Sequence, residues 1–171
     1  MTELTDEEFF CLEGCRSFEQ YHQMRRDFER HSCPFCDLDR NLNAVEWEDE
    51  LAYAWLVPNA YMRPELAYHA LFVPKRHVRF ETELTQSEVL SLHAAKKALH
   101  GAHGYRGGCT HVREGSMRLN AGTVPHLHYN TFMPNGTGSV RIPVFKDPGL
   151  QEGNKERAAM FAARYEKGES P

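Results

Sequence analysis

The stretch Asn120-Ala-Gly-Thr-Val-Pro-His126-Leu-His128-Tyr-Asn130 carries the most information about the fold and chemistry of this chain. Successive side chains of an extended strand point to opposite faces. A strand over residues 124–133 would therefore place the polar side chains of His126, His128 and Asn130 in one row on one face. Two histidines and an amide in such a row favour a catalytic or metal site over the alternative, a pair of hydrogen-bonded histidines on a half-exposed strand.

The residues before this row predict a loop of small residues. Asn120, Gly122 and Thr123 allow backbone N–H groups and a hydroxyl to approach a phosphate closely. We therefore expect this loop to bind the substrate next to the row.

A second motif, Cys33-Pro-Phe-Cys36, pairs two cysteines across two residues. In a reducing compartment such a pair more often marks metal or redox chemistry than a structural disulfide. Zinc prefers thiolates and imidazoles, so two further ligands would complete a tetrahedral site. A redox pair is less favoured because no βαβ pattern surrounds the motif, and a pair of packed thiols is a further alternative. The pair alone does not identify the other two ligands.

A third motif is His69-Ala-Leu-Phe-Val-Pro-Lys-Arg-His77, an apolar strand that ends in a basic corner and a histidine. Such a corner could place His77 beside a metal or a substrate phosphate. The alternative is an ordinary strand end with solvated charges.

Length and composition limit the class of protein. With 171 residues the chain is most simply one domain with a substantial core. A net charge of -4 argues against general binding to nucleic acid or to an anionic membrane. No apolar run is long enough to span a bilayer, and the acidic residues 1–8 lack the pattern of a signal peptide. We therefore expect a cytoplasmic protein.

The pattern of caps and apolar residues predicts an α+β fold. Capping boxes at Thr5–Glu8 and Thr85–Glu88 predict helices that run to about Glu29 and His100. Apolar or alternating segments predict strands within residues 47–56, 69–73, 110–112, 124–133 and 140–145, and a last helix covers residues 154–166. This order of elements favours a largely antiparallel sheet.

Taken together the motifs resemble the histidine-triad (HIT) superfamily of nucleotidyl hydrolases and transferases. The resemblance rests on His69-x-Leu-x-x-Pro-Lys-Arg-His77, on the helix start Leu84-Thr-x-x-Glu88 and on His126-Leu-His128 after a Gly-Thr loop. It implies a HIT-like fold, an antiparallel sheet of about five strands with a packed helix, and a homodimer. The expected organisation is a single domain over residues 1–171, with a helical extension at 1–30, a core at 33–134 and a C-terminal helix and tail at 153–171.

The resemblance also implies a metal site. Family members with an early pair of cysteines bind structural zinc, and the matching ligands here are Cys33, Cys36, His77 and His126. The remaining histidines, including His31, His69, His93, His100 and His103, are then expected to lie outside the site.

The middle histidine of the family motif is the nucleophile, and here it is His128. A neutral imidazole can attack the α-phosphorus of a nucleotide and form a nucleotidyl-histidine, provided that its other nitrogen donates to a carbonyl. Thr123 matches the family's hydroxyl that helps to hold the phosphate oxygens. The resemblance thus implies a nucleotide hydrolase or nucleotidyltransferase that cleaves a phosphoric anhydride or phosphoramidate at the α-phosphate of a nucleoside monophosphate.

Two departures from the family pattern affect this interpretation. Asn130 replaces the third histidine and cannot supply a proton at neutral pH. This favours a transferase-like enzyme, a slow hydrolase, a leaving group that needs little acid assistance, or loss of activity. No clear aspartate precedes His69 to bind a ribose, and Asn59 is the candidate for that contact.

Two alternative functions follow. One is a non-catalytic, zinc-stabilised HIT module that binds a nucleotide or a protein, which the two departures motivate. The other is a zinc hydrolase whose metal is itself catalytic, with water in an open position. The cysteine pair favours a closed structural site over the latter.

Overall fold

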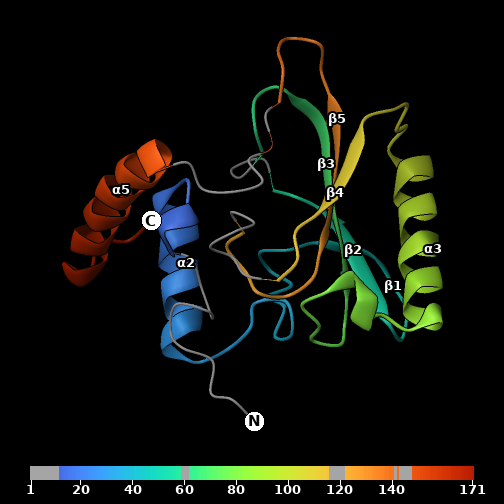
Figure 1. The fold of residues 1–171 in the computed structure, drawn as a ribbon, viewed down its shortest axis with the longest axis horizontal. Helices are drawn as coiled ribbons and strands as arrows, with labels where there is room; N and C mark the ends of the chain where they lie inside the picture. The colour runs from blue at the N-terminus through green and yellow to red at the C-terminus, as the bar shows by residue number, and fades with distance from the viewer. Residues whose placement is uncertain (1–11, 59–61, 116–121, 141, 143–147) are drawn as a thin grey trace. The chain divides into compact units, whose positions relative to one another are not determined.

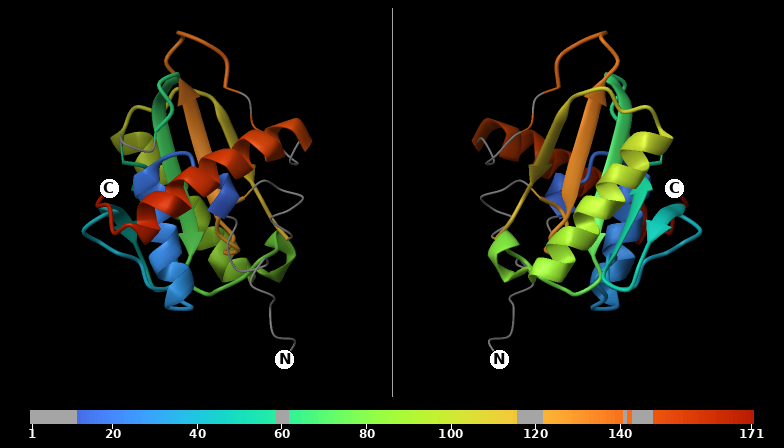
Figure 2. Two further views of the ribbon diagram at one scale, coloured as in Figure 1. Left: turned by 90° about the vertical axis from the view of Figure 1, so that its left-hand side faces the viewer. Right: turned by 90° about the vertical axis from the view of Figure 1, so that its right-hand side faces the viewer.

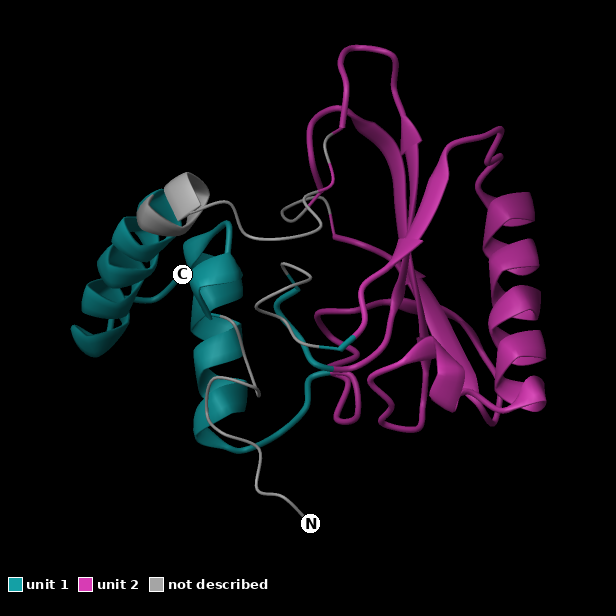
Figure 3. Cartoon of the chain, viewed as in Figure 1, with its two compact units in different colours: residues 1–34, 115–125, 143–171 teal, residues 35–114, 126–142 magenta. Residues whose placement is uncertain are grey.

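The computed structural model describes residues 12–58, 62–115, 122–140, 142 and 148–171. It divides into two compact units, which Figure 3 colours separately. Unit 1 comprises residues 1–34, 115–125 and 143–171, and unit 2 comprises residues 35–114 and 126–142. No helix in the described part of the chain is long and apolar enough to cross a membrane.

Unit 2 is built on one antiparallel sheet of five strands (Figure 1). The strand order is β1-β2-β3-β5-β4. The strands are β1 (Val45–Glu48), β2 (Ala52–Leu56), β3 (Leu66–Pro74), β4 (Cys109–Val112) and β5 (Tyr129–Pro134). This confirms the predicted α+β class and the antiparallel sheet of about five strands.

An acidic turn around Asp49 joins β1 to β2. The side chain of Asp49 accepts hydrogen bonds from the backbone N–H groups of Leu51 (2.8 Å) and Ala52 (2.9 Å). An aspartate that bonds to the backbone two residues on is a common way to close a turn. The two strands are therefore held in an antiparallel hairpin.

Helix α3 (Gln86–Ala102) lies against one face of the sheet (Figure 2). It begins at the predicted capping box, in which Thr85 and Glu88 each accept a hydrogen bond from the other's backbone N–H. Its buried residues Leu92, Ala95 and Leu99 recur at helical spacing and pack on the sheet. The second predicted helix is thus confirmed.

The register of the strands decides which residues face away from α3. Phe72 pairs with Tyr129, and both pack in the cluster beneath α3. Because side chains alternate along a strand, Asn130 projects from the opposite face. His111 of β4 lies directly opposite Asn130, so it shares that face.

Unit 1 contains a pair of helices, α2 (Phe18–Glu29) and α5 (Pro148–Glu166). The ring of Phe161 packs 5.9 Å from that of Phe18 and 5.8 Å from that of Tyr21. The predicted C-terminal helix is confirmed, and it begins six residues earlier than residue 154.

The predicted N-terminal helix is shorter at its start than expected. A separate 3-10 turn, η1 (Leu12–Gly14), precedes α2, and Ser17 caps α2 by accepting a hydrogen bond from the N–H of Gln20 (3.2 Å). This cap ends the run of helix toward the N-terminus. The capping box at residues 5–8 lies outside the described residues.

The predicted strand over residues 124–133 was wrong at its start. β5 begins at Tyr129, and residues 123–126 form a bend. Pro125 has no N–H to donate to a sheet, which accounts for the late start. Of the predicted strand at 140–145, residues 140 and 142 are not in a strand, and the other residues lie outside the described part of the chain.

Candidate functional site

Two cysteines and two histidines form a cluster with metal-ligand chemistry. The Sγ of Cys36 lies 3.3 Å from Nδ1 of His77 and 3.5 Å from Nδ1 of His126. Cys33, three residues before Cys36 in the chain, completes the set, and all four donor atoms lie within 4.8 Å of one another. These are the four residues that the sequence resemblance implied. Two thiols and two imidazoles are the donors of a closed tetrahedral zinc site.

A further contact orients His126 toward this cluster. Its Nε2–H donates to the carbonyl oxygen of Pro74 at 2.9 Å, which leaves the lone pair on Nδ1, the atom beside the cysteine. Burial is the main cause that lowers the pKa of His126 to about 4 and the pKa of His77 below its ordinary value. Both imidazoles are therefore neutral at pH 7, the form that binds metals.

His128 is held in one tautomer by the backbone of the neighbouring residue. Its Nδ1–H donates to the carbonyl oxygen of His126 at 2.7 Å, so the lone pair lies on Nε2. Burial, with a smaller effect of the charge of Arg113, lowers the pKa of His128 to about 4, although the bond to His126 opposes the shift. The ring of Phe35 packs 5.0 Å away. A buried, neutral imidazole with one defined lone pair has the properties of a nucleophile.

Asn130 is held by His69, a histidine that was expected to lie outside the metal site. Nε2 of His69 donates to Oδ1 of Asn130 at 3.0 Å, and both side chains are buried. His69 is not a member of the metal cluster, as expected, but its side chain orients Asn130. The sequence alone does not reveal this contact, because 61 positions separate the two residues. They meet only because β3 and β5 are neighbours in the sheet.

His111 is a second histidine on this face that sequence reasoning missed. Its ring lies 5.0 Å from the ring of Phe132, and burial is the main cause that lowers its pKa to about 4. His111 lies within the strand predicted at residues 110–112. Its place beside Asn130 follows only from the order of the strands, which the sequence does not show.

The predicted substrate loop is described in part. Gly122 is buried and Thr123 is half-buried, just before the bend that leads to His126. Asn120 and Asn59 lie outside the described residues. Substrate binding by these four residues stays a prediction.

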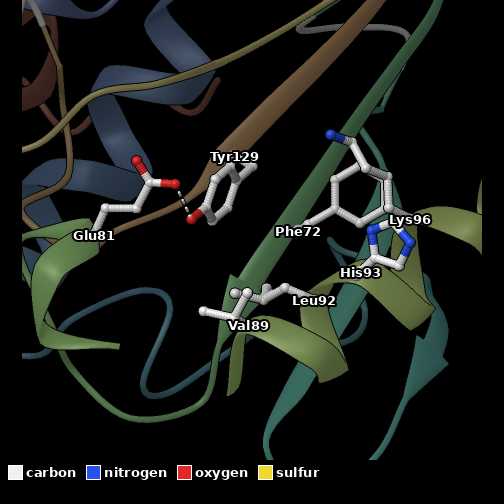
Figure 4. Close-up of a pocket in the computed structure, with 7 residues that line it drawn as sticks. All are labelled: Phe72, Glu81, Val89, Leu92, His93, Lys96 and Tyr129. Atoms are coloured by element: carbon white, nitrogen blue, oxygen red, sulfur yellow. Dashed lines mark hydrogen bonds between the residues drawn. The ribbon is translucent and has the colours of Figure 1, made fainter. Parts of the chain in front are cut away.

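A pocket on the other face of the sheet is not part of this constellation (Figure 4). Phe72 and Tyr129 line it from the sheet, Leu92 lines it from α3, and the hydroxyl of Tyr129 donates to Glu81 at 2.6 Å. Since Tyr129 alternates with His128 and Asn130 along the chain, the pocket lies on the opposite face of the sheet from these two residues.

Solved structures similar to this chain carry the family name that the motifs suggested. A HIT family hydrolase from Clostridium thermocellum is 25% identical and has a TM-score of 0.49, with 63% of this chain and 95% of that chain covered. A zinc-bound histidine triad family protein from Mycobacterium smegmatis is 22% identical, with a TM-score of 0.49 and coverage of 80% and 98%. A histidine triad protein from Clostridium difficile is 22% identical, with a TM-score of 0.49 and coverage of 64% and 96%. No protein-family model and no curated protein matches the chain.

Proposed function

We propose that this chain is a HIT-type nucleotidyl hydrolase or transferase that acts through a covalent nucleotidyl-His128 intermediate. The observation that carries the proposal is the bond of 2.7 Å from Nδ1–H of His128 to the carbonyl oxygen of His126. It fixes the tautomer in which Nε2 can attack.

The reaction would proceed in two displacements. Nε2 of His128 attacks the α-phosphorus, a P–N bond forms, and the bond from phosphorus to the leaving group breaks with its electron pair on the leaving atom. Water or another acceptor then attacks phosphorus and loses a proton, and the P–N pair returns to Nε2. The proposed role of the loop that contains Thr123 is to hold the charge of the phosphate oxygens.

The chemistry at position 130 favours one class of leaving group. Asn130 can donate a hydrogen bond from its amide but has no acidic proton, and its Oδ1 already accepts from His69. A leaving group that departs as a stable anion, such as a phosphate of an anhydride, needs no proton at that moment. An amine of a phosphoramidate does need one. We therefore propose that anhydrides are better substrates than phosphoramidates.

The four-residue cluster fits zinc in a structural role. Cys33, Cys36, His77 and His126 provide four donors, which fill a tetrahedron and leave no position for a reacting water. Zinc there would bind the segment after α2 to the end of β3 and to the bend before β5. This closed set disfavours the alternative in which the metal is catalytic.

The second candidate is a non-catalytic module that binds a nucleotide. The observation that favours it is the same Asn130, because the side chain at this position is tied to His69 and is not ionisable. The two candidates differ in turnover. Calorimetric binding of a nucleoside monophosphate, with no product from a broad panel of nucleotides, would favour the module.

The homodimer and the cytoplasmic location implied by the sequence stay predictions.

The test of the enzyme proposal is to trap the intermediate. The zinc-loaded protein is incubated with a dinucleoside polyphosphate or a nucleotide phosphoramidate labelled at the α-phosphate, quenched in denaturant and separated from free nucleotide. We expect an acid-labile protein-bound label on His128, faster formation from the anhydride, and loss of both label and turnover, on the order of 10³-fold or more, in His128→Ala.

His93→Ala is the matched control, since His93 is exposed on α3 beneath the other face of the sheet. It should retain the label. Turnover by His128→Ala equal to that of the unchanged protein would refute the covalent mechanism.

A further inference from the structure

Two neighbouring strands place an imidazole on either side of Asn130. On β3, His69 holds the amide oxygen of Asn130. On β4, His111 is the direct register partner of Asn130. Directly opposite residues of an antiparallel pair have Cβ atoms about 4.5–5.5 Å apart. The ring of His111 is therefore within reach of the space that a larger side chain at position 130 would fill.

The two ring nitrogens of His111 are not engaged by other described residues. Both ring nitrogens are buried, and neither has a hydrogen-bond partner in the described part of the chain. Its contact there is the ring of Phe132, at 5.0 Å and an interplanar angle of 40°. Buried polar groups in folded proteins nearly always have a partner, so an oxygen of a bound substrate is a candidate partner for one of these nitrogens.

The charge around His111 suits an anionic ligand. Its pKa is lowered first by burial and then by the positive charge of Arg113 and by His128, His69 and Arg63. A neutral imidazole always has one N–H donor. A donor close to arginines is attractive to an oxygen that carries negative charge.

We propose that His111 contacts the substrate and donates a ring N–H to the leaving-group oxygen of a nucleotide attacked by His128. This inference rests on the proposed function. While the bond from Nε2 of His128 to phosphorus forms, the bond from phosphorus to the leaving oxygen breaks and the oxygen keeps the electron pair. His111 stabilises that charge by a hydrogen bond and retains its proton. The anion later takes its proton from water.

Asn130 would support this role without replacing it. With Oδ1 held by His69 at 3.0 Å, its amide nitrogen is oriented as a second donor on the same face. The chain would thus use a histidine from β4 and an amide from β5 where a single histidine at position 130 would otherwise be expected.

The test varies the leaving group in the zinc-loaded full chain. His111→Val keeps a residue that suits a strand. The substrates are two esters of one nucleoside monophosphate, a nitrophenyl ester whose leaving oxygen needs little stabilisation and a phenyl ester that needs more. We expect a loss in kcat on the order of 10²- to 10³-fold for the phenyl ester, the usual effect of removing one donor to developing charge. The loss for the nitrophenyl ester should be less than a tenth as large, because less charge stabilisation is required.

Rescue gives a second measurement. Asn130→His in the His111→Val background should recover most of the phenyl ester activity, and His93→Val should behave like the unchanged protein with both esters. A loss of the same size for both esters, or no loss, would overturn the role of His111 while leaving the covalent mechanism intact. Absence of any nucleotidyl adduct in the unchanged protein would instead overturn the proposed function, and this inference with it.

Discussion

Three histidines illustrate how backbone contacts decide the role of a single residue. The pKa values of His111, His126 and His128 are each lowered to about 4, chiefly by burial, so all three are neutral at pH 7. They differ in the nitrogen that is occupied. His126 donates from Nε2 and His128 from Nδ1, so the lone pair lies on Nδ1 of His126 and on Nε2 of His128. Residue type alone could not have distinguished the proposed metal ligand from the proposed nucleophile.

At the residue scale, Glu88 leads to a prediction about how the stability of the protein depends on pH. Its carboxylate accepts two bonds from Arg76, at 2.9 and 2.8 Å, and others from Thr85, and these lower its pKa to about 2 from an ordinary 4.5. The unfolded chain therefore binds more protons between pH 4.5 and pH 2. The contribution of Glu88 to stability is fully present above pH 4.5 and is lost as the pH falls toward 2.

We expect Glu88→Gln to lower the free energy of unfolding at pH 6 and to lose less further stability between pH 5 and pH 3 than the unchanged protein. Urea unfolding followed by circular dichroism at each pH measures this. Glu50→Gln, at an exposed position of the β1–β2 turn, is the control and should parallel the unchanged protein. Parallel curves for Glu88→Gln would show that the ion pair does not contribute.

At the scale of elements, the sequence predicted the features that depend on nearby residues and missed the contacts that depend on strand order. The caps and apolar periodicity predicted α3 and the sheet class, because helix caps and side-chain periodicity depend on residues close in sequence. The motif order also suggested the four-residue metal cluster. The partners of Asn130 could not be predicted, since His69 and His111 approach it only through the order β3-β5-β4. The start of β5 was missed because alternation continued through Pro125.

At the beginning of β4, the backbone of Gly108 lies very close to the backbone of Phe132 in β5. Gly108 immediately precedes β4, and a Cβ built on it would lie 1.8 Å from the backbone oxygen of Phe132. Gly108→Ala should therefore force β4 away from β5 and destabilise the protein by about 1–3 kcal/mol. Gly101→Ala, in α3 with nothing within 4 Å of the added carbon, should stabilise it by up to about 1 kcal/mol. Urea unfolding of the two variants measures the contrast, and equal stabilities would contradict the assigned register of β4.

At the scale of the whole molecule, the proposed zinc would connect segments far apart in sequence. Its ligands come from residues 33–36, 77 and 126, so metal binding would restrict the unfolded chain and stabilise the folded one.

We expect one equivalent of zinc per chain by elemental analysis, and a fall in melting temperature of several degrees when a strong chelator removes it. Cys36→Ser should lower the melting temperature to the same degree and abolish the response to chelator. Cys109→Ser, which changes an exposed cysteine outside the cluster, should leave the response intact. A chelator response retained in Cys36→Ser would exclude this cluster as the site.

His126 contacts its neighbours through two different atoms. Its Nδ1 faces Cys36, and its carbonyl oxygen accepts a hydrogen bond from Nδ1–H of His128. Under the proposed function, this sets an order of maturation. A newly made chain would acquire its metal first, and only then would the carbonyl oxygen of His126 fix the tautomer of His128, two residues further along the chain. When zinc is scarce, the chain would then first become folded but inactive, and only later unfolded. The fraction of active chains in a preparation would therefore depend on how much zinc the chains have bound.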